Sequence, residues 1–128
     1  MVAEITYLTA YVNDPKKVLE FLVKHLGFFD HRRIGKRYVG KQGVLVSNRF
    51  GNNYLLVPAT ASIAANSNSN EPIIFNTDNC IRDYHQLMNA GIKIEQVPKY
   101  RTKGLELVIS DNYGNRYLLL EKRDYQEI

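Results

Sequence analysis

The side chains that could carry acid–base, nucleophilic or metal chemistry are few in this sequence. It contains three histidines, His25, His31 and His85, and a single cysteine, Cys80. A transition-metal site needs several nitrogen or oxygen donors that converge at about 2.0–2.3 Å, and a nucleophilic serine or cysteine needs a base within hydrogen-bonding reach. His25 and His85 fall in predicted helices, His31 falls in a predicted strand, and Cys80 begins a helix. Their spacing indicates neither a histidine metal centre nor a nucleophile with a histidine partner.

The elements that must position any site come from an internal repeat. The stretch FGNNYLLV at 50–57 returns as YGNRYLLL at 113–120, a shift of 63 positions with five of the eight residues identical. The shift extends towards the amino terminus, where Asp14 and Asp78 lie 64 positions apart. A repeat of this length in two copies predicts one pseudo-symmetric domain built from two copies of a supersecondary unit.

Hydrophobic periodicity gives the elements of the first unit. The alternation from Ile5 to Val12 predicts a strand. Asp14 followed by Pro15 is typical of a helix start, and the apolar stripe that follows ends at Gly27. Further strands are expected over 28–34, 38–48 and 54–57, so the unit is β-α-β-β-β.

The second unit has the same predicted order. A strand at 73–77 precedes a helix that Asp78 or Asn79 caps and Gly91 ends, and strands follow at 92–97, 105–110 and 116–121. Residues 99–104 are expected to form a basic loop. The helix residues expected to face inward are Ile81, Tyr84, Leu87 and Met88.

Composition limits the class of protein. The chain has 128 residues, enough for a single domain over 1–128, with repeats at about 1–57 and 72–121 joined by a small, polar linker at 58–71. The lone cysteine excludes a disulfide framework. The amino terminus lacks a signal-peptide pattern and no apolar run is long enough for a membrane span, so we expect a cytoplasmic protein with no membrane partner. The net charge of +4 is spread along the chain without a nucleic-acid-binding motif, so no nucleic acid partner is expected.

Two stretches carry a resemblance to a known family. NDPKKVLEFLVKHLGF at 13–28 and SDNYGNRYLLLEK at 110–122, in two β-α-β-β-β units, resemble the vicinal oxygen chelate superfamily of glyoxalases, bleomycin resistance proteins, extradiol dioxygenases and fosfomycin-resistance transferases. The resemblance covers nearly the whole chain outside the linker. It implies an α+β glyoxalase/bleomycin-resistance-like fold of two tandem βαβββ modules with a cupped mixed sheet, and family habit implies a homodimer.

The resemblance also locates the positions where the superfamily's enzymes hold a divalent metal with His and Glu side chains. The first-strand histidine position is Tyr7 in this chain. The last-strand glutamate position is Leu118, which the repeat matches to Leu55. The fourth position falls on Glu71 or Pro72. Because leucine offers no donor, no metal cofactor is expected, and Glu71 is the one plausible ligand that remains.

The strands are expected to turn mainly aromatic and aliphatic side chains towards the cup implied by the resemblance. Tyrosine hydroxyls among aliphatic groups are typical of a small-molecule pocket, although a filled core would use the same residues. Metal-free members of the superfamily bind and sequester drug-like molecules. We therefore expect an apolar or aromatic ligand, with an arginine meeting an anionic group at the rim. The predicted ligand-binding residues are Tyr7, Thr9, Tyr11, Leu55, Phe75, Leu118, Arg37 and Arg101; Val57 and Leu120 also face the cup.

Three functions stay open at this stage. The first is a metal-independent protein that sequesters an antibiotic or metabolite; bleomycin itself is cationic and suits a chain of pI about 9.2 poorly. The second is a metal-dependent lyase, isomerase, thiol transferase or dioxygenase with a displaced ligand set that includes Glu71, Glu121 or His31. The third is an interaction or regulatory subunit whose cup is solid core. Whether the chain is an enzyme is left open, with the absent ligands favouring a binding protein.

Overall fold

A computed structural model describes residues 8–30, 43–58 and 72–122 of the chain. It divides into two compact units, Met1–Ser69 and Asn70–Ile128, and the boundary falls within the expected linker. The prediction that both belong to one domain stays a prediction.

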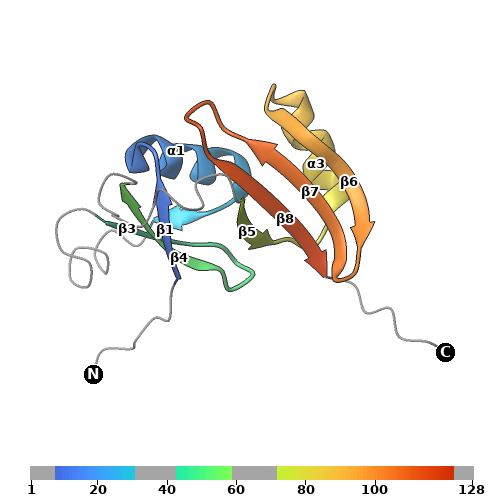
Figure 1. The fold of residues 1–128 in the computed structure, drawn as a ribbon, viewed down its shortest axis with the longest axis horizontal. Coiled ribbons are helices and arrows are strands. Elements are labelled where there is room, and N and C mark those ends of the chain that lie inside the picture. The colour runs from blue at the N-terminus through green and yellow to red at the C-terminus, as the bar shows by residue number, and fades with distance from the viewer. Residues whose placement is uncertain (1–7, 31–42, 59–71, 123–128) are drawn as a thin grey trace. The chain divides into compact units, whose positions relative to one another are not determined.

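The first unit is a four-stranded sheet with one helix. Its elements are β1 (Leu8–Val12), α1 (Pro15–Leu26), β2 (Phe29–Asp30), β3 (Val44–Ser47) and β4 (Asn53–Pro58) (Figure 1). The strand order is β1-β4-β3-β2, with β1 parallel to β4 and the other neighbours antiparallel. The helix packs on its own sheet through the buried side chains of Val18, Phe21 and Leu22.

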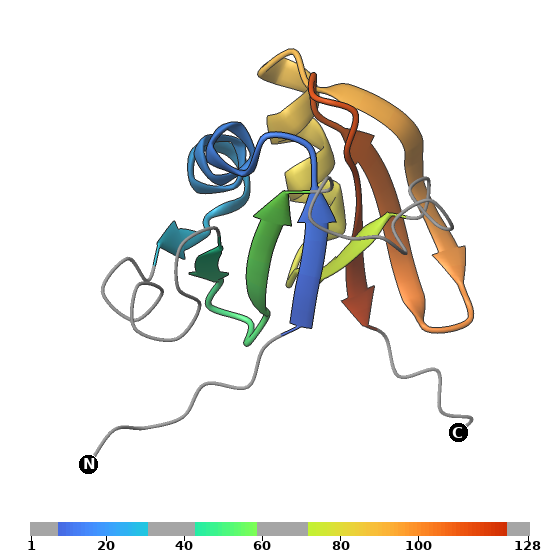
Figure 2. The ribbon, with the colours of Figure 1, turned by 60° about the vertical axis from the view of Figure 1, so that its left-hand side comes forward.

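The second unit repeats this plan. Its elements are β5 (Ile73–Asn76), α3 (Cys80–Asn89), β6 (Lys93–Arg101), β7 (Gly104–Ser110) and β8 (Arg116–Lys122). The order β5-β8-β7-β6, with β5 parallel to β8, matches the first unit strand for strand (Figures 1 and 2). The α+β class and the two βαβββ modules are thereby confirmed.

The repeated Gly-Asn stretch forms the same turn in both units. The Oδ1 atom of Asn48 accepts the backbone N–H groups two and four residues later at 3.0 and 2.9 Å, and Oδ1 of Asp111 does the same at 2.8 and 3.0 Å. Gly51 and Gly114 have φ of 88° and 90°, which favour glycine. The sequence repeat is therefore a repeat of hydrogen bonding as well.

The helix caps confirm the predicted helix starts but change their alignment. Asp14 caps α1, whereas Asn79, not Asp78, caps α3 and accepts the N–H of Arg82 at 2.9 Å. The two caps are thus 65 residues apart rather than 64. This difference of one residue affects the assignment of faces below, because each step along a strand reverses the side-chain direction.

Two expectations about the second unit were wrong in part, although Leu87 is buried as expected. Ile81 and Met88 are each 44% exposed, and the buried residues of α3 are Cys80 and Leu87. Both sets of positions fit a helical period of 3.6 residues, so periodicity alone could not distinguish them. The expected basic loop at 99–104 is also shorter, because β6 continues to Arg101. As an edge strand, β6 tolerates Pro98 and two register shifts.

No helix within the described residues combines the length and the apolar character that crossing a membrane requires.

Candidate functional site

The candidate site lies on the side of the second sheet opposite α3. Strand register places Leu118 opposite Ile74 of β5 and Val108 of β7, and places Leu120 opposite Asn76. Side chains directly opposite each other share a face of a sheet. Ile74 is half-exposed and Leu118 is partly exposed, whereas Val108 and Leu120 are buried, each with 6% exposure. We call the surface centred on Ile74, Val108, Leu118 and Leu120 the Leu118 face.

One end of the Leu118 face carries an ion pair. Arg116 lies opposite Ser110 and places its Nε 2.7 Å from Oε1 of Glu95. Partial burial alone would raise the pKa of Glu95. Hydrogen bonds from Arg116 and Ser110, together with the positive charges of Arg116 and Lys93, outweigh that effect and hold the pKa of Glu95 below its usual range. The carboxylate is therefore ionised at neutral pH, and its contribution to stability is lost only as the pH falls through that lowered pKa.

The other end of the face carries a polar network around Arg101. An Nη atom of Arg101 donates to Oε1 of Gln96 at 3.2 Å, and its Nε lies 4.0 Å from Oε1 of Glu106. The Gln96 amide donates in turn to the Glu106 backbone carbonyl at 3.5 Å. Since Glu106 lies opposite Leu120 and Gln96 lies opposite Val108, the network borders the apolar centre. The role of Arg101 in meeting an anionic group at the rim stays a prediction.

Phe75 does not lie on the Leu118 face, so its predicted place beside Leu118 was wrong. Register pairs it with Leu119, it is 1% exposed, and its ring stacks on that of Tyr117 at 5.7 Å between centroids. The predicted alignment used an offset of 64 for this strand. Leu55 and Leu118 are equivalent in the repeat, and they lie opposite Thr9 and Ile74, respectively. Thr9 is therefore equivalent to Ile74, so the first strands of the two units are offset by 65 residues. One residue of slip moved Phe75 to the helix side.

The same register bears on the expected metal position. The same offset of 65, applied to the sequence alone, matches Tyr7 with Pro72 rather than with Glu71. Proline has no donor side chain, and neither Leu55 nor Leu118 has one. Leu55, Pro72 and Leu118 therefore provide no ligand for a metal ion. Within residues 8–30, 43–58 and 72–122, no three His, Cys, Asp or Glu side chains are grouped to hold one.

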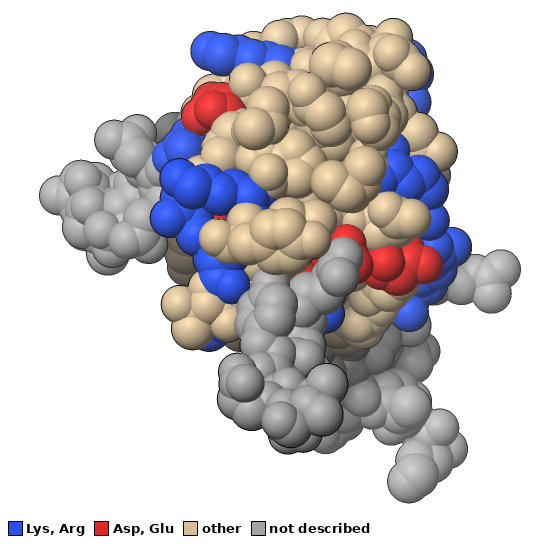
Figure 3. All heavy atoms as spheres, turned by 90° about the vertical axis from the view of Figure 1, so that its right-hand side faces the viewer, with Lys and Arg blue, Asp and Glu red and all other residues tan. Residues whose placement is uncertain are grey.

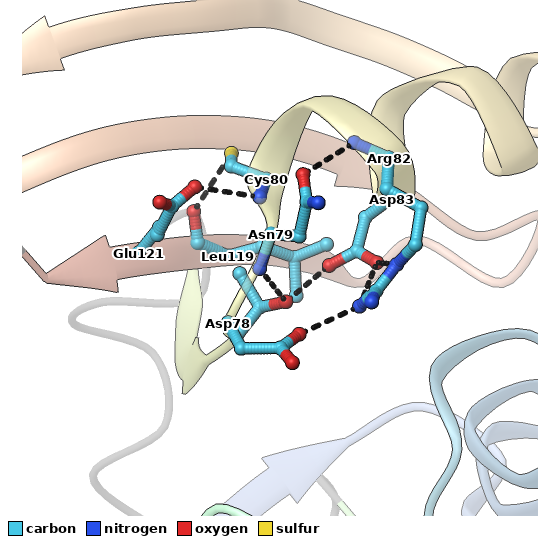
Figure 4. A network of polar contacts seen from close by, with 8 residues as sticks. Asp78, Asn79, Cys80, Arg82, Asp83, Leu119 and Glu121 are labelled. Carbon is cyan, nitrogen blue, oxygen red and sulfur yellow. Dashed lines mark hydrogen bonds and ion pairs between the residues drawn. The ribbon is translucent and has the colours of Figure 1, made fainter.

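Glu121, a member of the alternative ligand set, has a structural contact on the α3 side. Its Oε1 accepts the N–H of Cys80 at 2.8 Å and so caps the first turn of α3 from β8 (Figure 4). Arg82 pairs with Asp78 at 2.7 Å in the same network. These contacts tie the helix start to the last strand.

Replacing Glu121 with Ala is expected to lower the free energy of unfolding by about 1–2 kcal/mol, because α3 loses a capping acceptor. Glu121→Gln keeps an oxygen acceptor and should cost clearly less. Urea unfolding of the two variants measures the difference. Equal losses in both would show that the hydrogen bond to Cys80 is not what Glu121 contributes.

Of the predicted site residues of the first unit, the structure describes Thr9, Tyr11 and Leu55, and these share one face of its sheet. Thr9 is opposite Leu55 and Tyr11 is opposite Val57. Tyr11 is 50% exposed, so its hydroxyl and ring are accessible. The predictions for Tyr7, Arg37, Glu71 and His31 lie outside the described residues. The prediction that this face and the Leu118 face contribute to one cup stays a prediction.

Sequence reasoning missed the polar residues at the ends of the Leu118 face. Glu95, Gln96, Glu106 and Arg116 were not among the predicted site residues. Alternation along β7 and β8 could have identified Glu106 and Arg116. Each lies two residues from an apolar residue of the Leu118 face on its own strand, and such residues point to the same side of the sheet. Register shifts after Ile94 and Gln96 interrupt the alternation of β6, so no simple pattern assigns Glu95 and Gln96.

Comparison with known proteins gives a consistent family. The model of the Glyoxalase/Bleomycin resistance protein/Dioxygenase superfamily matches residues 4–118. An uncharacterized protein from Shewanella frigidimarina (strain NCIMB 400) is 30% identical over an alignment of 135 residues that covers all of both chains.

Solved structures share the fold. TnmS3, described as an antibiotic binding protein from Streptomyces sp. CB03234, aligns with a TM-score of 0.69 at 21% identity over 96% of this chain and 99% of its own. A member of the glyoxalase/bleomycin resistance protein/dioxygenase superfamily from Sphaerobacter thermophilus DSM 20745 aligns with a TM-score of 0.65 at 22% identity, over 93% of this chain and 97% of its own.

Proposed function

The chain belongs to the Glyoxalase/Bleomycin resistance protein/Dioxygenase superfamily, and from this premise we propose that it binds an apolar or aromatic small molecule, an antibiotic or a metabolite, without a metal ion. The ligand is sequestered rather than transformed. The observation that carries the proposal is Leu118. It occupies the position where the superfamily's enzymes have a metal-binding glutamate, and it stands in an apolar surface formed with Ile74, Val108 and Leu120.

The chemistry of the Leu118 face supports binding of an organic molecule. Small-molecule sites combine an apolar lining with a few fixed polar groups that orient the ligand. Here the apolar centre has the Arg116–Glu95 pair at one end and the Arg101–Gln96 contact at the other. Leucine in place of a carboxylate removes a metal donor and adds apolar area, which favours retention of a ligand by burial. The description of TnmS3 as an antibiotic binding protein is in keeping with this function.

A thermal-shift screen of aromatic antibiotics and metabolites tests the proposal. A ligand that binds only the folded state stabilises it by about 2.7 kcal/mol at a hundredfold excess over Kd, so a true ligand should raise Tm by several degrees. The shift should persist after EDTA treatment, and elemental analysis should find far less than one metal ion per chain.

Two results would contradict the proposal in different ways. A stoichiometric metal, together with a shift that EDTA removes, would favour the metal-dependent enzyme. A library without any ligand that stabilises the chain would favour the solid-core interaction subunit. The homodimer and the cytoplasmic location stay predictions, and light scattering at micromolar concentration tests the former.

A further inference from the structure

The Leu118 face carries more positive than negative charge. Among the described residues of the second unit, Lys93 and Arg116 both lie opposite Ser110, one on each neighbouring strand, and so share its face of the sheet. Lys99 lies opposite Glu106 on the same face. Arg101 and Lys122 both lie opposite Gly104. Against these five cations the register and the ion pairs place two carboxylates, Glu95 and Glu106. Figure 3, which views the structure from the side where Figure 1 draws β6, shows Lys and Arg side chains at both margins of a largely uncharged area, with Asp and Glu side chains beside them.

Arg101 is the cation best prepared to meet a ligand. Its side chain is 46% exposed, yet Gln96 holds one of its N–H groups and Glu106 attracts it from 4.0 Å. A guanidinium presents five N–H donors in a fixed fork, so the contact with Gln96 uses a small part of its capacity. The planar fork matches a carboxylate or sulfonate through two parallel hydrogen bonds.

The spacing defines the size of a ligand. Arg101 belongs to β6, whereas Leu118 and Leu120 belong to β8, two strands further across the sheet. Neighbouring strands lie about 4.8 Å apart and residues along a strand about 3.4 Å apart. Arg101 is paired through Gly104 with Lys122, so its Cα lies about 17 Å from that of Leu118 and about 12 Å from that of the nearer Leu120. A molecule of two fused or linked rings with one acidic group spans the shorter of these distances.

We propose that Arg101, positioned by Gln96, binds the anionic group of an amphiphilic organic acid whose aromatic body covers Leu118 and Leu120. This inference rests on the proposed function and specifies the ligand class of the same site. Gln96 is a positioning residue, because it acts through the guanidinium.

Two fluorescent probes separate the charge from the apolar contact. 8-Anilinonaphthalene-1-sulfonate and N-phenyl-1-naphthylamine share one aromatic skeleton, and only the first carries an anion. In the full-length chain, Arg101→Gln should raise the Kd of the sulfonate probe about tenfold and leave that of the neutral probe within about twofold. Arg101→Lys keeps the charge without the fork, so both Arg101→Lys and Gln96→Ala should give intermediate losses for the sulfonate probe alone.

Lys17→Gln is the matched control, since it removes one positive charge from an exposed position of α1. It should change neither affinity. Melting curves of all variants confirm that the probes report folded protein. Suppose that both probes bind the wild type. If Arg101→Gln then weakens the binding of both probes equally, or weakens the binding of neither, the anionic inference is overturned while the proposed function stands. If neither probe binds the wild type saturably, the anionic inference is overturned, and the library screen decides the proposed function.

Discussion

Leu118→Arg is expected to abolish the stabilisation that a bound small molecule gives to the wild-type chain. The substitution puts a long cation into the apolar centre between Ile74 and Val108. A ligand would then have to cover a charge without a partner, which costs far more than an apolar contact gains. The rise in Tm of several degrees expected for the wild type should fall to within the error of the measurement.

The control for this variant is Ile81→Arg. Ile81 is also apolar and partly exposed, but it lies on α3, on the other side of the second sheet. It gains the same charge, so it should keep the ligand-induced shift. The same hit compounds and the same differential scanning measurement serve both variants. A shift that survives in Leu118→Arg would place the ligand elsewhere.

Asp111→Ala is expected to lower the free energy of unfolding by about 3 kcal/mol. The Asp111 carboxylate is buried and accepts four hydrogen bonds, from two backbone N–H groups, the Asn115 amide and the Tyr117 hydroxyl at 2.6 Å. Alanine leaves these donors without their acceptor, and each unsatisfied buried group costs about 1–3 kcal/mol. Relaxation of the turn recovers part of that cost. Urea unfolding followed by circular dichroism measures the loss.

Two milder variants separate the contributions to this network. Asn48 builds the same turn in the first unit, so Asp111→Asn should keep the backbone contacts and lose less than half as much stability as alanine. Tyr117→Phe tests the hydroxyl alone. Burial and the Asp111 hydrogen bond raise the pKa of Tyr117, so the phenol stays protonated as a donor, and its removal should cost about 1–2 kcal/mol. An alanine variant as stable as the wild type would contradict the role of the turn.

The modules were predictable because local chemistry and the repeat agree. Asp14 with Pro15, Gly27 and the two Gly-Asn turns each specify backbone geometry through their own side chains or conformational freedom. Such signals do not depend on what packs against them. They gave the α1 bounds and the β-α-β-β-β order directly.

Register is what the sequence could not supply. Asp14 and Asp78 suggested an offset of 64, whereas the structure uses Asn79 as the cap and an offset of 65. Nothing in β5 itself distinguishes Phe75 from Ile74 as the residue that faces Leu118, because both are apolar. The pairing with β8 decides, and pairing is a tertiary property. The polar network around Arg101 was hidden for the same reason, since two register shifts interrupt β6.

The most direct test of the binding proposal is methyl NMR of the Leu and Val side chains during titration with 8-anilinonaphthalene-1-sulfonate in the presence of EDTA. The methyl groups of Leu118 and Leu120 should show intermolecular NOEs to the probe and saturable shift changes. Those of Leu107 and Leu119, on the α3 side of the same sheet, should show no NOEs. NOEs to Leu119 instead of Leu118, or binding that requires an added metal ion, would contradict metal-free binding on the Leu118 face.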